Sequence, residues 1–312
     1  MVSNLMRRRA PWLVMVAALL LSVTPFSTLA DHHKATRTPV TFTFTFVEDV
    51  SGEEWSDEAG IFHFRSVAIQ EVSGDISGTA TINFSGEFEP VGECTEESCP
   101  AYFSFRAQAE ITGEDGGWTG TYAASGSDVP GDEFYGEMLV LKGTGGNAGK
   151  SIVASLVEET EDSATFEGVL VSQGAANMGL NTSVRLCADP ETFTFTGGFL
   201  STGAIEGHGG ASIEPIVAGG PWTHTYAVAG TFTLTDEHGS VTIAFAGGAQ
   251  DNYTPSFEAS HFWGHFVVLE GTGAYAELYA NGRIIGTAGG PSPTCESGFG
   301  VNASLIGEAR FN

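Results

Sequence analysis

The chain has 312 residues, of which 42% are hydrophobic and 22 are phenylalanine, and its formal net charge is −26. That much apolar side-chain volume excludes a disordered chain, because it can build a sizeable core. The negative charge argues against nucleic acid as a partner, since an acidic surface repels it.

The first thirty residues have the pattern of a secretory signal peptide. Arg7-Arg8-Arg9 form a basic start, Trp12 to Val23 form an apolar core too short for a comfortable membrane span, and Thr28-Leu29-Ala30 form a small-residue cleavage site. Cleavage leaves nine basic and 38 acidic residues, a net charge of −29. We therefore expect a secreted protein, extracellular or periplasmic, without stable membrane insertion after cleavage.

Cleavage after Ala30 would make Asp31-His32-His33 the new amino terminus. The amine, two amide nitrogens and the His33 imidazole can form the square-planar set that copper(II) or nickel(II) favours. The alternative is that these are ordinary polar residues following a signal.

From Pro39 onward the hydrophobic pattern has a period of two. Phe42, Phe44 and Phe46 alternate with threonines, which predicts a strand with one buried face. The next stretch, Glu48 to Glu58, carries six carboxylates and is expected to be a solvated loop. A calcium site is the alternative there, although the ligand spacing of an EF-hand is missing.

The sequence contains one unit used twice. His261 to Tyr275 has a degraded copy at Glu133 to Gly145, and both contain Gly-Thr-Gly, at residues 271–273 and 143–145. We predict repeat 1 at residues 39–171, a linker rich in Gly, Ala and Asn at 172–186, and repeat 2 at 187–312. No convincing amphipathic helix is present, and glycines recur inside short strands. The pattern therefore predicts an all-β protein of two tandem antiparallel barrels, each with seven or eight strands.

Four cysteines in an exported chain favour two disulfides. Pairing Cys94 with Cys99 and Cys187 with Cys295 keeps each bridge inside one repeat, so we prefer it to the two crossed pairings. A zinc site at Cys94 and Cys99 is less favoured, because no histidine lies in that segment.

The best candidates for a ligand site lie in the second copy. His261, Trp263 and His265 share one face of a predicted strand, with the two imidazoles about 13 Å apart, too far to chelate one ion. We take these three and Tyr275 as candidate ligand-lining residues, with solvent-facing histidines as the alternative. Ungapped alignment makes Glu133, Tyr135 and Glu137 their equivalents in repeat 1. No catalytic residue is assigned, because the chain has neither a nucleophile elbow nor a His-Glu-x-x-His motif.

Four glycine-containing motifs carry a resemblance to a known family: Gly203-Ala204-Ile205-Glu206-Gly207, Gly230-Thr231-Phe232-Thr233-Leu234, Gly239-Ser240-Val241-Thr242-Ile243 and Gly271-Thr272-Gly273-Ala274-Tyr275. Their order resembles the allene oxide cyclase barrel-like superfamily, which includes plant dirigent proteins, over residues 193–312 and more faintly 41–170. The resemblance implies an eight-stranded antiparallel barrel whose lumen holds a small apolar molecule. Plant members cyclise a fatty-acid epoxide or steer the coupling of phenoxy radicals without a metal or organic cofactor. Their functional residues do not carry over, since the matching positions are structural.

These observations favour a binding or surface module for a small apolar ligand, with no cofactor, because fold alone does not imply chemistry. The alternative is a cofactor-free isomerase or cyclase acting on an apolar substrate in the lumen of repeat 2. A third interpretation, action through the acidic surface, would require dependence on calcium or salt. The oligomeric state is left open.

Overall fold

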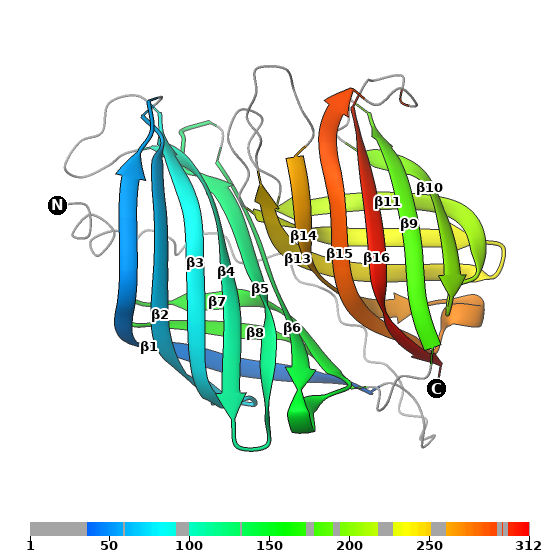
Figure 1. Cartoon of the computed structure of the whole chain (residues 1–312), viewed down its shortest axis with the longest axis horizontal. Helices are drawn as coiled ribbons and strands as arrows, with labels where there is room; N and C mark the ends of the chain where they lie inside the picture. Colours follow the sequence, from blue (N-terminus) through cyan, green and yellow to red (C-terminus); the bar gives the residue numbers. More distant parts are fainter. Residues whose placement is uncertain are drawn as a thin grey trace.

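The computed structural model describes residues 36–58, 60–91, 100–131, 133–172, 178–189, 194–217, 227–250, 260–291, 295 and 299–311. These residues form two closed barrels of eight antiparallel strands that lie beside one another (Figure 1). Barrel 1 consists of β1 (Thr36–Ser56), β2 (Phe62–Gly74), β3 (Gly78–Pro90), β4 (Ala101–Gly113), β5 (Gly116–Ser127), β6 (Phe134–Thr144), β7 (Lys150–Glu159) and β8 (Ser163–Ser172). Barrel 2 consists of β9 (Met178–Ala188), β10 (Phe195–Gly203), β11 (Gly207–Val217), β12 (Ala227–Asp236), β13 (Gly239–Gln250), β14 (Ser260–Gly271), β15 (Leu278–Pro291) and β16 (Phe299–Phe311).

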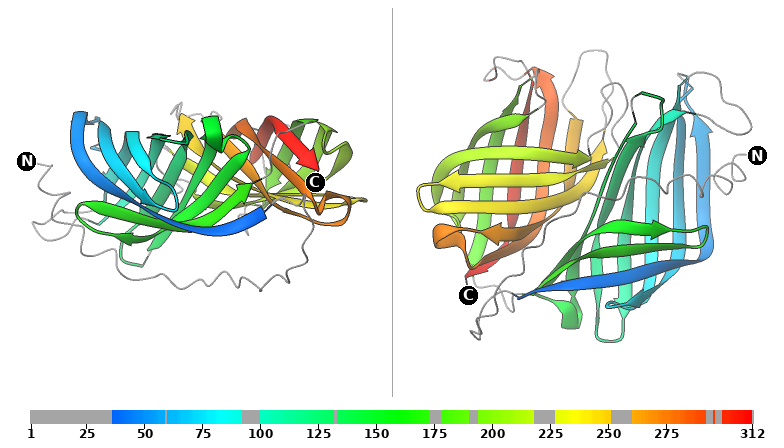
Figure 2. Two further views of the ribbon diagram at one scale, coloured as in Figure 1. Left: turned by 90° about the horizontal axis from the view of Figure 1, so that it is seen from below. Right: turned by 180° about the vertical axis from the view of Figure 1, so that it is seen from behind.

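Each barrel has an up-and-down topology. Consecutive strands pair with one another, and the last strand pairs with the first, β8 with β1 and β16 with β9. Seen from behind, β7 and β8 cross the back of barrel 1, and β11 to β13 cross the back of barrel 2 (Figure 2). Among the described residues the only helices are single 3-10 turns, η2 (Gly145–Asn147) and η3 (Gly273–Tyr275). The predicted all-β tandem barrels are confirmed.

The boundary between the repeats differs from the predicted one. Residues 178–186, assigned to the linker from composition, belong to β9, which closes barrel 2 between β16 and β10. Leu180, Val184 and Leu186 of this strand are buried inside the barrel. Thr182 is a polar residue among these apolar inward positions, and it is fully buried. Its burial is tolerated because its hydroxyl forms a hydrogen bond of 2.6 Å with the Ser201 hydroxyl.

The acidic stretch after Phe46 is a strand and not the expected loop. β1 runs for 21 residues, and Glu48 to Ser56 pair with β2. Arg65 on β2 lies 3.7 Å from the Glu53 carboxylate and 5.4 Å from the Trp55 ring centroid. These contacts offset part of the repulsion among the carboxylates of the stretch.

In both barrels, every second side chain along a strand points inward, and these side chains fill the interior. In barrel 1, Phe42, Phe44 and Phe166 contact one another with ring centroids 5.6 to 5.8 Å apart. In barrel 2, Phe232 and Phe245 are 4.9 Å apart. Burial of such aromatic side chains supplies most of the driving force for closure.

The disulfide predicted in repeat 2 is present. Cys187 follows the buried part of β9, and its sulfur is bonded to Cys295 at 2.03 Å. The bridge ties β9 to the segment that precedes β16, within one barrel. Cys94 and Cys99 lie outside the described residues, as do the predicted signal peptide and Asp31-His32-His33. No helix in the described part of the chain is long and apolar enough to cross a membrane.

The outer faces of the two barrels pack together, a contact that the repeat pattern did not predict. We call this contact the seam. Its apolar part consists of small and branched side chains from both barrels: Ala123, Met138, Val140 and Val171 with Ala227, Ala229, Ala244, Ala246, Val267 and Tyr279. Its polar part includes a hydrogen bond of 2.6 Å from Arg37 Nε to the carbonyl of Leu269.

Candidate functional site

The four residues predicted to line a ligand do not form one site. His261 and Trp263 project outward from β14 and line an open groove on the outside of barrel 2. His265 follows on the same face, half-buried near the seam. Burial lowers the pKa of His265, and the positive charges of Arg283 and Lys142 lower it further.

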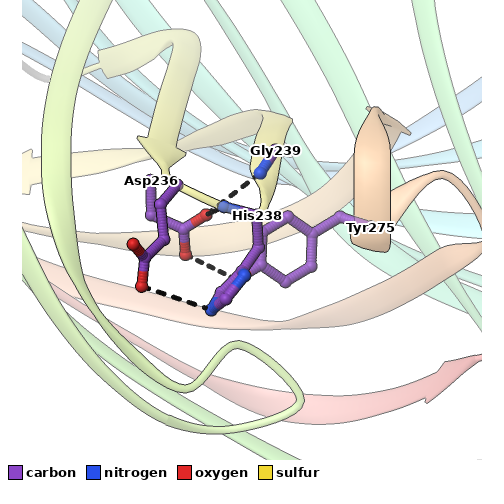
Figure 3. A network of polar contacts seen from close by, with 5 residues as sticks. Asp236, His238, Gly239 and Tyr275 are labelled. Atoms are coloured by element: carbon purple, nitrogen blue, oxygen red, sulfur yellow. Dashed lines mark hydrogen bonds and ion pairs between the residues drawn. The ribbon is translucent and has the colours of Figure 1, made fainter.

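Tyr275 lies apart from the histidines, inside barrel 2, and has a structural role. Its hydroxyl donates to Asp236 Oδ2 at 2.5 Å, while Asp236 Oδ1 accepts from the His238 and Gly239 amides at 2.8 and 3.1 Å (Figure 3). Burial of Asp236 raises its pKa, but these three hydrogen bonds outweigh it and leave the pKa below the ordinary value. The network ties the turn between β12 and β13 to η3.

The lumen of barrel 2 is occupied by its own side chains. Phe199, Phe232, Phe245, Phe262 and Phe266 point inward, and none is more than 5% exposed. A ligand-sized cavity would leave accessible surface on the side chains that line it. The lumen expected to hold a ligand in repeat 2 is therefore packed where the structure describes it.

Barrel 1 is different at one end. Toward that end its inward side chains are aromatic and only partly covered, in contrast to the fully buried Phe42 and Ile111 deeper inside. We call this the aromatic end. It consists of Phe62, Phe64, Phe84, Phe88, Phe103, Phe105 and Tyr135.

A partly buried polar cluster lies among these rings, with Tyr135 46% exposed. Glu137 Oε2 accepts hydrogen bonds from the hydroxyls of Tyr122 and Tyr135, the latter at 2.6 Å. Glu137 Oε1 accepts from the Leu156 amide at 2.5 Å, and the two tyrosine oxygens are 3.1 Å apart. The tyrosine rings also contact the aromatic end, because Phe103 lies 6.2 Å from Tyr135 and Phe105 lies 5.8 Å from Tyr122.

Burial dominates the electrostatics of this cluster. It raises the pKa of Glu137, and the three hydrogen bonds lower that pKa only in part, while the nearby Glu159 raises it. Burial likewise raises the pKa of Tyr122 and of Tyr135, which the Glu137 charge raises further. Both phenols therefore remain hydrogen-bond donors to the Glu137 carboxyl, and burial makes that carboxyl harder to ionise than an exposed glutamate.

Strand register shows that barrel 2 lacks this cluster. In barrel 1, Tyr122 pairs with Leu139 and Gly126 with Tyr135, while in barrel 2 the equivalent Phe245 pairs with Phe266 and Ala249 with Phe262. The three polar residues Tyr122, Tyr135 and Glu137 thus correspond to Phe245, Phe262 and Gly264. Two tyrosines and a glutamate in one barrel are two phenylalanines and a glycine in the other.

This register corrects the ungapped alignment of the two copies. Thr242 pairs with Glu270 and the next residue, Ile243, pairs with Val268, so Leu269 is an extra residue in β14. β6 contains no such bulge. His265 therefore corresponds to the outward Met138 and not to Glu137, whose side chain points inward with Leu139 and Leu141.

Sequence reasoning missed Glu137 as a site residue because of that bulge. The usable signal was the period of two in β6, where Glu137 continues the inward positions of Leu139 and Leu141. A carboxylate at an inward position of an apolar strand is costly unless it is hydrogen-bonded, and so it marks a candidate site.

The described ranges contain no group of three or more His, Cys, Asp or Glu side chains placed to hold a metal ion. The amino-terminal copper or nickel hypothesis and the Cys94–Cys99 pairing concern residues outside those ranges. Comparison with protein-family models, with curated proteins and with solved structures gives no match to this chain. What the fold and the site define is a class of architecture: a tandem pair of eight-stranded barrels, one with an interior filled by buried phenylalanine side chains and one with a hydrogen-bonded carboxyl at an aromatic end.

Proposed function

We propose that the protein is an exported, non-catalytic binding module that takes a small apolar ligand at the aromatic end of barrel 1. The ligand has an apolar body, which the phenylalanine rings cover, and one polar group that bonds to Glu137 or a tyrosine hydroxyl. Binding sites for small molecules commonly combine apolar walls with a few convergent polar groups. The signal-like first thirty residues and the disulfide in barrel 2 support export into an oxidising compartment.

One observation carries the proposal: the chain contains the same barrel once with the polar cluster and once without it. Barrel 2 closes with Phe245, Phe262 and Gly264 at the positions where barrel 1 has Tyr122, Tyr135 and Glu137. Closing the barrel therefore does not require the carboxyl cluster. Because burying a carboxyl opposes folding, its presence in barrel 1 alone supports a role in recognition.

The test is titration of the mature protein with Nile red, a neutral apolar dye, followed by fluorescence. We expect saturable binding that Phe103→Ala weakens roughly tenfold, because the variant removes a half-buried ring from the aromatic end. Leu200→Ala is the matched control, since Leu200 is 64% exposed on the outside of barrel 2. Absence of saturable binding would contradict the proposed function, and equal effects of the two variants would contradict its placement in barrel 1.

A cofactor-free isomerase or cyclase at the same end is the second candidate. It is favoured by Glu137, because a carboxyl hydrogen-bonded among aromatic rings, with its pKa raised by burial, is a candidate general acid or base. The test is incubation with the fatty-acid epoxide that plant members of the resembling superfamily cyclise. A rate above the uncatalysed one that Glu137→Gln abolishes, with Nile red binding retained, would favour the enzyme. A rate equal to the uncatalysed one would reject the enzyme.

A further inference from the structure

A second candidate site lies on the outside of barrel 2, away from the aromatic end of barrel 1. It is an open groove of about 620 Å³ across β14, β15, β16 and β9. Strand register aligns its outward side chains in two rows that run across the strands. The first row is wholly polar and consists of His261, Thr287, Asn302 and Arg185, each paired with the next. With strands about 4.8 Å apart, this row is about 14 Å long.

The second row provides an apolar platform beside the polar one. Trp263 pairs with Ile285, and Ile285 pairs with Ser304. Ile285 is 50% exposed, and the Trp263 ring is half-buried. The Arg106 guanidinium of barrel 1 lies 4.8 Å from the Trp263 ring centroid, which fixes the ring by a cation–π contact across the seam.

The groove is basic on a strongly acidic protein. Arg185 and His261 lie at its two ends, and Arg283 and His265 pair in the row directly beside Trp263. Among the described residues, no Asp or Glu lines the groove, and neither Arg185 nor Arg283 forms an ion pair. The Arg185 guanidinium in the groove therefore provides a planar donor set that suits a carboxylate ligand, and Arg283 adds positive charge in the next row.

Barrel 1 has an outer groove that serves as an internal comparison. Arg65 lines this groove and lies 5.4 Å from the ring centroid of the neighbouring Trp55. Its lining includes Glu53, whose carboxylate is 3.7 Å from Arg65. The barrel 1 groove therefore already contains its own anion, and the barrel 2 groove does not.

We propose that the groove of barrel 2 binds a short acidic oligosaccharide, with uronic-acid carboxylates on Arg185 and sugar hydroxyls along the polar row. Thr287, Asn302 and His261 offer the donors and acceptors that a hydroxyl-rich chain requires. Trp263 offers a flat apolar surface for the apolar face of a sugar ring.

The length of the ligand is limited by the rest of the surface. The formal charge of −26 repels a long polyanion, including nucleic acid, once it extends beyond the groove. At physiological salt charges are screened over about 8 Å, so a ligand confined to the groove responds mainly to Arg185 and His261, which line it, and to Arg283 in the next row. A short acidic chain satisfies both conditions.

The test is calorimetric titration of the mature protein with trigalacturonate, with its fully methyl-esterified form and with a short single-stranded oligonucleotide. We expect saturable binding of trigalacturonate, binding roughly tenfold weaker for the ester, and binding roughly tenfold weaker for Arg185→Gln, because the charge-assisted hydrogen bonds are lost. Arg65→Gln is the matched control in the other groove and should leave the affinity unchanged. Urea unfolding of Arg185→Gln beside the unmodified protein reports that the variant folds, whether or not Nile red binds to barrel 1.

Three results would overturn the proposal. They are failure of trigalacturonate to bind, equal affinity for the acid and its ester, and equal losses in Arg185→Gln and Arg65→Gln. Tighter binding of the oligonucleotide than of trigalacturonate would reject the carbohydrate in favour of nucleic acid. Because the groove and the aromatic end lie on different barrels, failure of one proposal leaves the other standing.

Discussion

The hydroxyl oxygens of Ser151 and Tyr279 are 2.8 Å apart across the seam, and the two residues occupy the same position in the two repeats. Each is the second residue of its strand, β7 or β15. The equivalent strands β5 and β13 also contact one another. Corresponding surfaces of the two barrels thus face each other, as they do in an isologous dimer, although here one chain supplies both halves.

This relationship predicts a measurable coupling between the barrels. Tyr279 is fully buried, and Asn281 Nδ2 also donates to its hydroxyl at 2.9 Å and to Ser151 Oγ at 3.3 Å. Tyr279→Phe should lower the free energy of unfolding by about 1–3 kcal/mol, because buried partners are left unsatisfied. Ser151→Ala and the double variant complete a cycle in urea unfolding, with an expected coupling of about 1 kcal/mol. Strictly additive losses would mean that the contact does not join the barrels energetically.

The Glu137 cluster predicts a pH dependence whose sign can be worked out. Burial raises the pKa of Glu137 above its usual 4.5. The folded protein therefore holds this proton more tightly than the unfolded chain, so the stability contributed by Glu137 is full below about pH 4.5 and is lost as the pH rises through the folded pKa. Glu137→Gln removes the titration. The stability of this variant relative to the unmodified protein should therefore rise as the pH is raised above about 4.5 in urea unfolding.

The matched control for that experiment is Glu110→Gln. Glu110 is exposed on the outward face of β4, so its substitution should give a stability difference that changes little over the same pH range. A difference for Glu137→Gln that is constant, or that falls as the pH rises, would show that the carboxyl is not buried as described.

Much of the architecture is readable in the sequence because it depends on local periodicity. Alternating Phe and Thr at 41–46 fixes the inward face of β1, and the matched glycines at Gly74 and Gly203 mark the same strand end in each barrel. Both adopt positive φ, 116° and 95°. Local patterns of this kind survive divergence, because each position is constrained by its own backbone geometry or burial.

The candidate site was not readable, because it depends on register between strands. The extra residue Leu269 shifts the β14 residues before it by one position relative to β6. An ungapped alignment therefore matches inward residues of one strand with outward residues of the other. The bulge also presents the Leu269 carbonyl to Arg37 of the other barrel. A single sequence reveals neither effect, since neither leaves a local pattern.

The Asp236 network predicts two linked changes in pKa. Burial together with Asp236 raises the pKa of Tyr275 to about 12. Asp236→Asn should lower it toward the usual 10, because the carboxylate charge is removed while the burial remains. Conversely, Tyr275→Phe should raise the pKa of Asp236, because one of its three donors is lost. NMR titration of the tyrosine ring and the carboxyl groups measures both, and an unchanged Tyr275 pKa in Asp236→Asn would contradict the network.

The strand end at Gly203 predicts a large effect from one methyl group. Gly203 has φ +95°, and an added Cβ would lie 2.1 Å from the Gly179 carbonyl oxygen on β9. Gly203→Ala therefore suffers both backbone strain and a clash with backbone that is held in the barrel, and it should lose about 2–4 kcal/mol of unfolding free energy. Gly179→Ala is the matched control on the facing strand, because its Cβ would meet nothing within 4 Å. It should be neutral or slightly stabilising, through restriction of the unfolded chain. Urea unfolding of both variants measures the contrast, and equal stabilities would mean that β9 does not close barrel 2 against β10 in the register described here.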